Sequence, residues 1–238
     1  MAADGVVGPP RDPWELPDVS GLTVGVVGGT GEQGRGLATR WATAGLRVII
    51  GSRIEARATA AAVEVGQAIG APGAVLGMVN ADCAEAADVV LVAVPWASHA
   101  DTVAALAGPL AGKVVIDCVN PLGFDKQGAY PLPVPEGSAA GQAAELLPES
   151  RVVAAFHHVS AKLLADLSMT EVPSDVLVLG DDREATDTVQ ALAALIPGMR
   201  GVYAGRLRNA GQVEALTANL ISINRRYKAH SSVAVTGV

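Results

Sequence analysis

A glycine-rich stretch near the start of the chain constrains the fold most. An apolar run ends there in glycines, of which Gly29, Gly31 and Gly34 stand at the spacing G-x-G-x-x-G. A helix-competent run follows at 31–44, and a second apolar run at 47–51. The glycines allow a tight turn, a close approach of backbone to phosphate, and close helix packing. Strand, glycine turn, helix and strand in this order predict a βαβ unit whose turn binds the pyrophosphate of a dinucleotide.

Strand and helix patterns alternate along the rest of the chain. Strands are expected at 22–27, 47–51, 74–78, 88–94, 113–118, 151–156, 175–180 and around Tyr203. Helices are expected at 31–44, 53–69, 80–86, 97–107, 139–147, 183–195 and 209–230, with a long loop over 120–141. This alternation predicts an α/β protein with a Rossmann-type, doubly wound parallel sheet and a small C-terminal α/β portion. We expect a flexible proline-rich leader (1–20), a dinucleotide-binding domain (21–150) and a small C-terminal domain (151–238).

Composition excludes several classes of function for these 238 residues. The net charge is −7 and no long run of Lys or Arg occurs, so no nucleic-acid or membrane-surface partner is expected. The apolar runs have the length of strands, so no transmembrane helix is expected, and the first residues do not resemble a secretory signal. Cys83 and Cys118 lie far apart in the sequence and outside any C-x-x-C pattern. They indicate reduced, buried thiols in a cytoplasmic protein.

The end of the second predicted strand indicates which dinucleotide binds. An NAD enzyme usually places a carboxylate there, to accept hydrogen bonds from the ribose hydroxyls. This chain has Gly51, Ser52 and Arg53 instead. A hydroxyl and a guanidinium suit a phosphate dianion, and Arg57 and Thr30 are placed to join them. The pattern therefore favours NADP over NAD.

Further candidate residues follow the later predicted strands. In such sheets the ligand binds outside the carboxyl ends of the strands, so these residues are candidates for contacts near the nicotinamide. They are Val94, Pro95 and Trp96, then Asn120 and Pro121, then the segment Phe156, His157, His158, Val159 and Ser160. An alternative interpretation of Pro95 and Trp96 is a strand terminator with a half-buried indole.

The two adjacent histidines are poor candidates for metal ligands. In an extended segment, His157 and His158 point to opposite faces, so they cannot both bind one metal and at most one faces the cleft. One buried and one exposed structural histidine is at least as good an interpretation. We find no nucleophile elbow, no metal-ligand cluster and no obvious Lys or Tyr proton-donor pair. We therefore expect no metal and no catalytic acid or base, which suits direct hydride transfer between two oriented cofactors.

Five stretches together resemble one known family. They are GGTGEQGRGLA, VIIGSR, AVPW, AFHHVSA and VEALTANLISIN. These stretches are similar to the NADP-dependent oxidoreductases of coenzyme F420, an 8-hydroxy-5-deazaflavin. The resemblance extends from Leu22 to Tyr227, which is nearly the whole chain apart from the leader.

The resemblance implies roles for particular residues. Hydride would pass between NADP(H) and coenzyme F420, a small-molecule co-substrate, in a slot lined by Pro95, Trp96 and Val159. The C-terminal domain would complete the deazaflavin pocket, and family members are homodimers that pair partly through the C-terminal helix. By the resemblance, the 2′-phosphate is held by Thr30, Ser52, Arg53 and Arg57; the pyrophosphate by the loop of Gly29, Gly31, Glu32 and Gln33; the nicotinamide by Val94, Pro95 and Trp96; and the deazaflavin by Asn120, Pro121, His157, Val159 and Ala161, with Arg206–Thr217 closing the pocket.

Two other functions fit the sequence. One is an NADPH-dependent imine or keto-acid reductase of a related Rossmann family, although such enzymes usually carry a larger all-helical domain with a Lys or Asp acid. The other is an NADP sensor without catalytic activity. Tight NADPH binding without turnover of any acceptor would identify the sensor.

Overall fold

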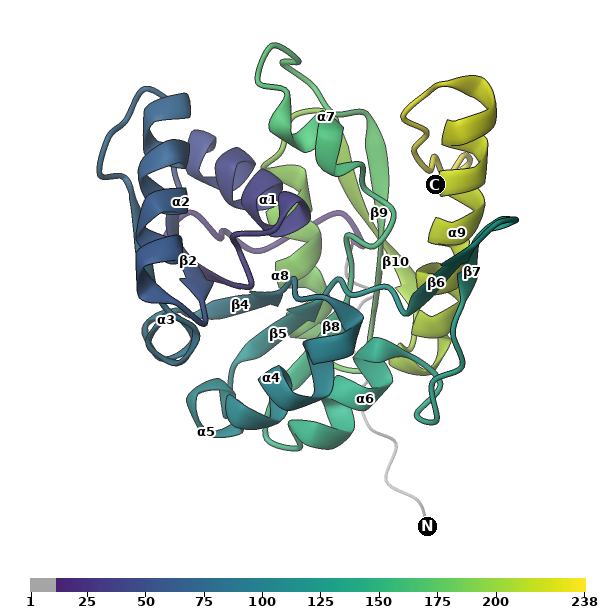
Figure 1. Ribbon diagram of the computed structural model, residues 1–238, viewed down its shortest axis with the longest axis horizontal. Helices are drawn as coiled ribbons and strands as arrows, with labels where there is room; N and C mark the ends of the chain where they lie inside the picture. The colour runs from purple at the N-terminus through teal and green to yellow at the C-terminus, as the bar shows by residue number, and fades with distance from the viewer. Residues whose placement is uncertain (1–11) are drawn as a thin grey trace.

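A mostly parallel sheet of eight strands runs through the centre of the computed structural model, which describes residues 12–238 (Figure 1). The strand order is β10-β9-β8-β5-β4-β1-β2-β3, and only the β8–β9 pair is antiparallel. The predicted α/β fold with a doubly wound sheet is confirmed. The strands are β1 (Thr23–Val27), β2 (Arg47–Ser52), β3 (Val75–Val79), β4 (Val89–Val92), β5 (Val114–Asp117), β8 (Arg151–Ala154), β9 (Ser174–Gly180) and β10 (Met199–Gly205).

Helices cover both faces of the sheet, because its central strands are apolar on both sides. One face packs against α1 (Glu32–Thr43), α2 (Glu55–Ala68), α7 (Ala161–Ala165) and α8 (Arg183–Ala194). The other packs against α3 (Asn80–Ala86), α4 (His99–Ala105), α5 (Ala107–Leu110), α6 (Ala139–Leu146) and the start of α9 (Ala210–Tyr227). Among the helices of residues 12–238, none is both long and apolar enough to cross a bilayer.

The prediction of a long loop over 120–141 is wrong. Strands β6 (Leu122–Asp125) and β7 (Gly128–Pro131) form an antiparallel hairpin there that packs against α9. The Asp125 carboxylate accepts hydrogen bonds from the N–H groups of Gln127 and Gly128, and Gly128 has a φ of 129°. A short polar turn with one glycine therefore closes a hairpin that the nearby prolines obscured in the sequence.

Other expected elements differ in their bounds. The single helix expected at 97–107 is instead a 3₁₀ turn, η1 (Trp96–Ser98), followed by α4 and α5. The strand expected near Tyr203 is the seven-residue β10, at the edge of the sheet. A second 3₁₀ turn, η2 (Leu207–Asn209), precedes α9, which ends where Lys228 adopts the left-handed conformation.

Helix α7 was not predicted, since five residues give too weak a pattern. One buried side chain from α1 holds this part of the chain. The Arg40 guanidinium donates four hydrogen bonds of 2.7–2.9 Å to the backbone carbonyls of Leu163, Leu164, Asp166 and Met169. A guanidinium satisfies several C-terminal carbonyls at once because its N–H groups point in fixed directions.

The described part of the predicted leader, residues 12–20, lies against the body of the protein. Val19 is buried in the core, and the Arg200 guanidinium lies 5.2 Å from the ring centroid of Trp14. The remainder of the leader, residues 1–11, lies outside the described residues. Because β8, β9 and β10 continue the same sheet, no gap in the sheet marks residue 150, and the division into domains stays a prediction.

Replacing Arg40 by methionine should destabilise the fold by about 2–4 kcal/mol, because four carbonyls lose their donor at a buried position. Urea unfolding followed by circular dichroism measures this. Arg35→Met on the same helix is the matched control. Its exposed ion pair with Glu64 should contribute less than about 1 kcal/mol. Equal losses in the two variants would contradict the role given to Arg40.

Candidate functional site

The glycine loop after β1 has the geometry of a phosphate-binding turn. Gly28 has a φ of 76°, and a Cβ there would lie 2.7 Å from the carbonyl oxygen of Ala93. A Cβ on Gly29 would lie 2.8 Å from the carbonyl oxygen of Val26. At Gly31 the nearest atom to a Cβ is 3.6 Å away, so the protein alone does not require glycine at this position. A Cβ on Gly31 would instead occupy space beside the first turn of α1, where a ligand can approach.

The start of α1 is free to bind an anion. Gly31 is its N-cap, and no side chain caps the helix. The first N–H groups of a helix have no partner within it, and they lie at the positive end of the helix dipole. The loop and the uncapped helix therefore fit the pyrophosphate of a dinucleotide.

The end of β2 lies beside this loop. The N–H of Gly29 donates a 3.1 Å hydrogen bond to the carbonyl of Gly51. Ser52 is buried, and its Oγ accepts from the N–H of Ile54 at 3.3 Å, whereas Arg53 and Arg57 are exposed. Neither arginine forms a salt bridge with any residue in 12–238. Two unpaired guanidinium groups beside a loop with this geometry suit an additional phosphate.

A cavity of about 290 Å³ lies at the carboxyl ends of β4, β5 and β8, and we call it the strand-end cavity. It brings together seven residues that the sequence placed in the site, with Thr217 of α9 beside them. The seven are Gln33, Val94, Pro95, Trp96, Asn120, His157 and Val159. Its remaining lining residues are Ala93, Cys118 and Val119, so no carboxylate or lysine faces it.

The predicted residues outside this cavity lie elsewhere in the fold. Pro121 is buried, and its carbonyl accepts a hydrogen bond from Leu132 in the chain after the hairpin. Ala161 begins α7 and lines two other cavities. Of the stretch expected to close the pocket, Thr217 lines the strand-end cavity, whereas Arg206 bonds the carbonyl of Asp181 and lines a different cavity.

The segment after β8 is a turn, so the extended conformation expected for 156–160 is wrong. Phe156 has a φ of 65°, which is strained for an aromatic residue. Its carbonyl accepts a hydrogen bond from Gln33 at 3.1 Å. The carbonyl of His157 accepts from Asn120 at 2.9 Å and from Thr217 at 3.1 Å. Side chains from α1, the end of β5 and α9 therefore fix this turn beside the strand-end cavity.

Both histidines are buried, so the interpretation of one buried and one exposed histidine is wrong. Nε2 of His158 accepts from the N–H of Leu177 at 3.2 Å. Neither ring nitrogen of His157 has a hydrogen-bond partner among the described residues. Burial lowers the pKa of each to about 4, so both are neutral at pH 7. Within residues 12–238 no group of His, Cys, Asp and Glu could hold a metal ion.

Behind the strand-end cavity lies a buried pair that the sequence did not reveal. Nε2 of His99 lies 2.7 Å from Oδ2 of Asp117, and neither side chain is exposed. Nδ1 of His99 lies 2.9 Å from Oε1 of Gln142. Burial alone would lower the pKa of His99, but the hydrogen bond and charge of Asp117 outweigh it and raise that pKa.

This pair positions two parts of the cavity wall. The second carboxylate oxygen of Asp117 accepts from the N–H of Val119 at 3.0 Å, and the His99 ring lies 5.4 Å from the Trp96 ring. Asp117 could have been noticed as one charge within an apolar strand. His99 and Gln142 gave no signal that linked them to it.

Glu214 of α9 is a second buried acid. It accepts hydrogen bonds of 2.9 and 3.1 Å from the N–H groups of Ala139 and Ala140, at the start of α6. One carboxylate oxygen lies 4.0 Å from Nε2 of His157. Burial raises the pKa of Glu214 to about 7, and the two N–H groups oppose that rise. Glu214 therefore joins α6 and α9 one helical turn before Thr217.

The strand-end cavity can bind and orient small molecules and can exclude water. Few of its lining groups are able to exchange a proton. Its lining is apolar or amide-like apart from Thr217, Cys118 and the neutral His157. Burial raises the pKa of the Cys118 thiol far above its usual value, so no thiolate forms there. Such a lining suits transfer of a hydride between two bound molecules.

Comparison with known proteins gives one consistent family. The family model described as NADP oxidoreductase, coenzyme F420-dependent, matches residues 23–121. The chain is 39% identical over 216 residues to an F420-dependent NADP reductase of Methanothermobacter thermautotrophicus, covering 89% of this chain and 93% of that protein. It is 37% identical over 213 residues to a protein of the same name from Methanocaldococcus jannaschii, covering 87% of this chain and 94% of that protein.

Solved structures agree with this result. A crystal structure from Arthrobacter sp. FB24, provisionally called an F420-dependent NADP reductase, has a TM-score of 0.72 and 28% identity, covering 90% of this chain and all of that one. A pyrroline-5-carboxylate reductase from Coxiella burnetii has a TM-score of 0.56 at 13% identity, covering 87% of this chain and 67% of that one. The second likeness concerns the fold alone.

The raised pKa of Glu214 predicts a pH dependence of stability. It lies at about 7 in the folded protein, against an ordinary value of 4.5, so the unfolded chain releases this proton at lower pH. The stabilising contribution is therefore complete below pH 4.5 and is lost as the pH rises to about 7. At about 1.4 kcal/mol per pKa unit, the loss approaches roughly 3 kcal/mol.

Urea unfolding of wild type and Glu214→Gln at a series of pH values measures this loss. The wild-type free energy of unfolding should fall relative to the variant between pH 4.5 and 7 and then stay level. Glu145→Gln, at an exposed position on α6, is the matched control and should show no such trend. A constant difference for Glu214→Gln would mean that folding does not raise the pKa of this carboxyl.

Proposed function

Since this chain belongs to the family of coenzyme F420-dependent NADP oxidoreductases, we propose that it transfers a hydride reversibly between NADP(H) and the deazaflavin coenzyme F420. The strand-end cavity carries this proposal. It opens at the carboxyl ends of the strands, has Gln33 of α1 in its wall, and is lined by Pro95, Trp96 and Val159 with no carboxylate or lysine. When bound, NADPH supplies the hydride.

The glycine loop and the end of β2 bind the nucleotide in this proposal. Gly29, Gly31, Glu32 and Gln33 surround the pyrophosphate, with the uncapped start of α1 providing N–H donors. The 2′-phosphate is bound by Thr30, Ser52, Arg53 and Arg57. Exposed, unpaired arginines support this role, because a phosphate dianion then meets no competing carboxylate in an ion pair.

The walls of the strand-end cavity orient the two reacting rings. Val94, Pro95 and Trp96 form the nicotinamide side, and the turn that holds His157 and Val159 forms the deazaflavin side, with Asn120, Pro121 and Ala161 behind or beside it. The bonds from Asn120 and Thr217 to the His157 carbonyl tie that turn to the end of β5 and to α9. An apolar, fixed wall excludes water and favours close approach of the reacting carbons.

We also propose that the protein works as a homodimer in the cytoplasm. The resemblance to the family supports pairing through the C-terminal helix. Ile223 and Tyr227 of α9 are 40% and 73% exposed, which leaves apolar surface on that helix. Cys83 and Cys118 are both free and buried, as suits a reducing compartment.

Isotope labelling tests the reaction. With NADPH labelled at the transferable position, the label should appear on the deazaflavin and none of the transferred hydrogen should come from solvent. Fading of the deazaflavin absorbance gives the rate. Wash-out of the label into water, or reduction of imines or keto acids without reaction of the deazaflavin, would favour the related reductase instead. Tight NADPH binding without any turnover would favour the sensor.

Arg53→Ala should weaken NADP(H) binding by about 1.5–3 kcal/mol and leave NAD(H) binding nearly unchanged, because only the 2′-phosphate needs the guanidinium. Titration of nucleotide fluorescence measures both affinities. Arg47→Ala is the matched control, because Arg47 lies at the other end of β2 and donates to the carbonyl of Gly21. An equal loss for both nucleotides in Arg53→Ala would rule out the phosphate role.

A further inference from the structure

A second and larger cavity adjoins the strand-end cavity. Its volume is about 560 Å³, and it lies between the turn at 157–160, the start of α7 and the last turns of α9, so we call it the α7–α9 cavity. His157, Val159 and Thr217 line both cavities. The two cavities therefore adjoin along these three residues.

The lining of the α7–α9 cavity has unused hydrogen-bonding capacity. Five buried side-chain atoms in the described part of the chain lack a partner, and four of them belong to residues that line the α7–α9 cavity. They are both ring nitrogens of His157, Nδ1 of His158 and Oγ of Ser231. Because Nε2 of His158 accepts a hydrogen bond from Leu177, Nδ1 of this neutral ring carries the proton. Unpaired buried donors are costly, so their gathering at one cavity points to a polar ligand.

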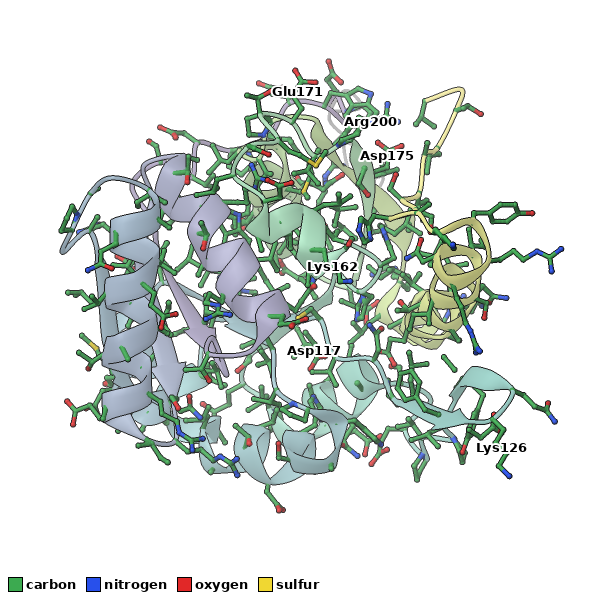
Figure 2. The ribbon with its side chains drawn as sticks, turned by 45° about the horizontal axis from the view of Figure 1, so that its top comes forward. Asp117, Lys126, Lys162, Glu171, Asp175 and Arg200 are labelled. Carbon is green, nitrogen blue, oxygen red and sulfur yellow. The ribbon has the colours of Figure 1, made fainter. Side chains whose placement is uncertain are left out.

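The charge of the lining selects an anion. Lys162 and Lys228 line the cavity, and no Asp or Glu does. Neither lysine forms a salt bridge within residues 12–238. Lys162 projects from α7 toward the centre of the view in Figure 2. It also borders a third cavity that contains Glu32 and Glu64, but it pairs with neither.

The other lysine lies at the C-terminal end of α9. Lys228 adopts the left-handed conformation with a φ of 51°, and the N–H of Ser231 donates to Oδ1 of Asn224 at 2.6 Å. The chain therefore turns sharply after α9 and closes the cavity with Ser231. A cavity with two free ammonium groups and neutral donors, and without carboxylates, matches phosphate or carboxylate oxygens.

We propose that the α7–α9 cavity binds the anionic side chain of the deazaflavin, whose phosphodiester and carboxylate groups extend from a ring held in the strand-end cavity. The inference rests on the proposed function, since it assumes that the deazaflavin is the hydride partner. It assigns Lys162 and Lys228 to recognition of the side chain and gives them no part in hydride transfer. A free inorganic anion has the same chemistry, and the experiment separates the two sources.

Steady-state kinetics with two acceptors tests the assignment. One acceptor is the complete coenzyme, and the other is the same deazaflavin ring with only its uncharged polyol chain. In the double variant Lys162→Ala/Lys228→Ala, the KM for the complete coenzyme should rise about tenfold or more. Its kcat should stay near the wild-type value, and the KM for the uncharged acceptor should change less than about twofold.

Lys126→Ala is the matched control, because Lys126 is exposed in the turn between β6 and β7 and lines neither cavity. It should leave both KM values unchanged. Circular dichroism verifies that the double variant is folded, and Lys162→Arg/Lys228→Arg should restore most of the affinity for the complete coenzyme. A structural role for the lysines would instead change the KM of both acceptors.

The results of these experiments distinguish a failure of the side-chain site from a failure of the proposed function. If wild-type protein reduces both acceptors but the lysine variants treat them alike, the side-chain site is wrong and the reaction stands. If inorganic phosphate binds wild type and not the double variant while the KM values do not respond, the cavity is a free-anion site and the assignment fails. If neither acceptor reacts with wild-type protein, the proposed function itself fails.

Discussion

The candidate site depends on two backbone carbonyls, those of Phe156 and His157. A non-glycine residue with positive φ is unfavourable, so the turn after β8 keeps its shape only because surrounding groups impose it. Gln33, Asn120 and Thr217 supply the hydrogen bonds, and the Phe156 ring packs edge-on against Trp41 with ring centroids 5.6 Å apart. These groups come from three separate parts of the chain, so the wall of the strand-end cavity is held by contacts distant in the sequence.

Strands β9 and β10 run in the opposite direction to the rest of the sheet, and this reversal brings α9 to the candidate site. Gly205 pairs with Leu179, and Leu179 pairs with Ala154, so β10 ends close to the level at which β8 ends. The chain then enters α9 beside the carboxyl ends of the parallel strands, and Thr217 reaches the turn after β8. Figure 1 shows α9 passing along the side of the sheet beside β6 and β7. At the other end of the same two strands, Arg200 of β10 and Asp175 of β9 form an ion pair with an N–O distance of 2.8 Å. Both side chains are labelled in Figure 2.

Local pattern predicted most of the fold. The alternation of apolar runs and helical runs was enough for the central strands and for α1, α2, α8 and α9, because each buries a whole face along its length. The hairpin at 122–131 and helix α7 were missed for a different reason. Both are short elements held by partners distant in the sequence, α9 for the hairpin and Arg40 for α7.

The candidate site likewise has one part that the sequence predicted and one part that it did not. Strand ends are visible in a sequence, so seven of the predicted residues line one cavity. The supporting layer was not visible, because Asp117 and His99 are 18 residues apart and Glu214 caps a helix 74 or 75 residues earlier in the chain. Buried charges are positioned by such long-range pairing, and no local spacing encodes it.

The glycines between positions 28 and 31 are under two different constraints, one from the fold and one from the ligand. Gly28 and Gly29 are required by the protein itself, since a Cβ would collide with the backbone of Ala93 after β4 or of Val26 in β1. Gly31 has no such collision and leaves its space to whatever binds there. A library of variants sorted only for folding would therefore be free to change position 31, whereas one sorted for nucleotide binding would not. Within this loop, positions 28 and 29 therefore serve the fold, and position 31 serves the ligand.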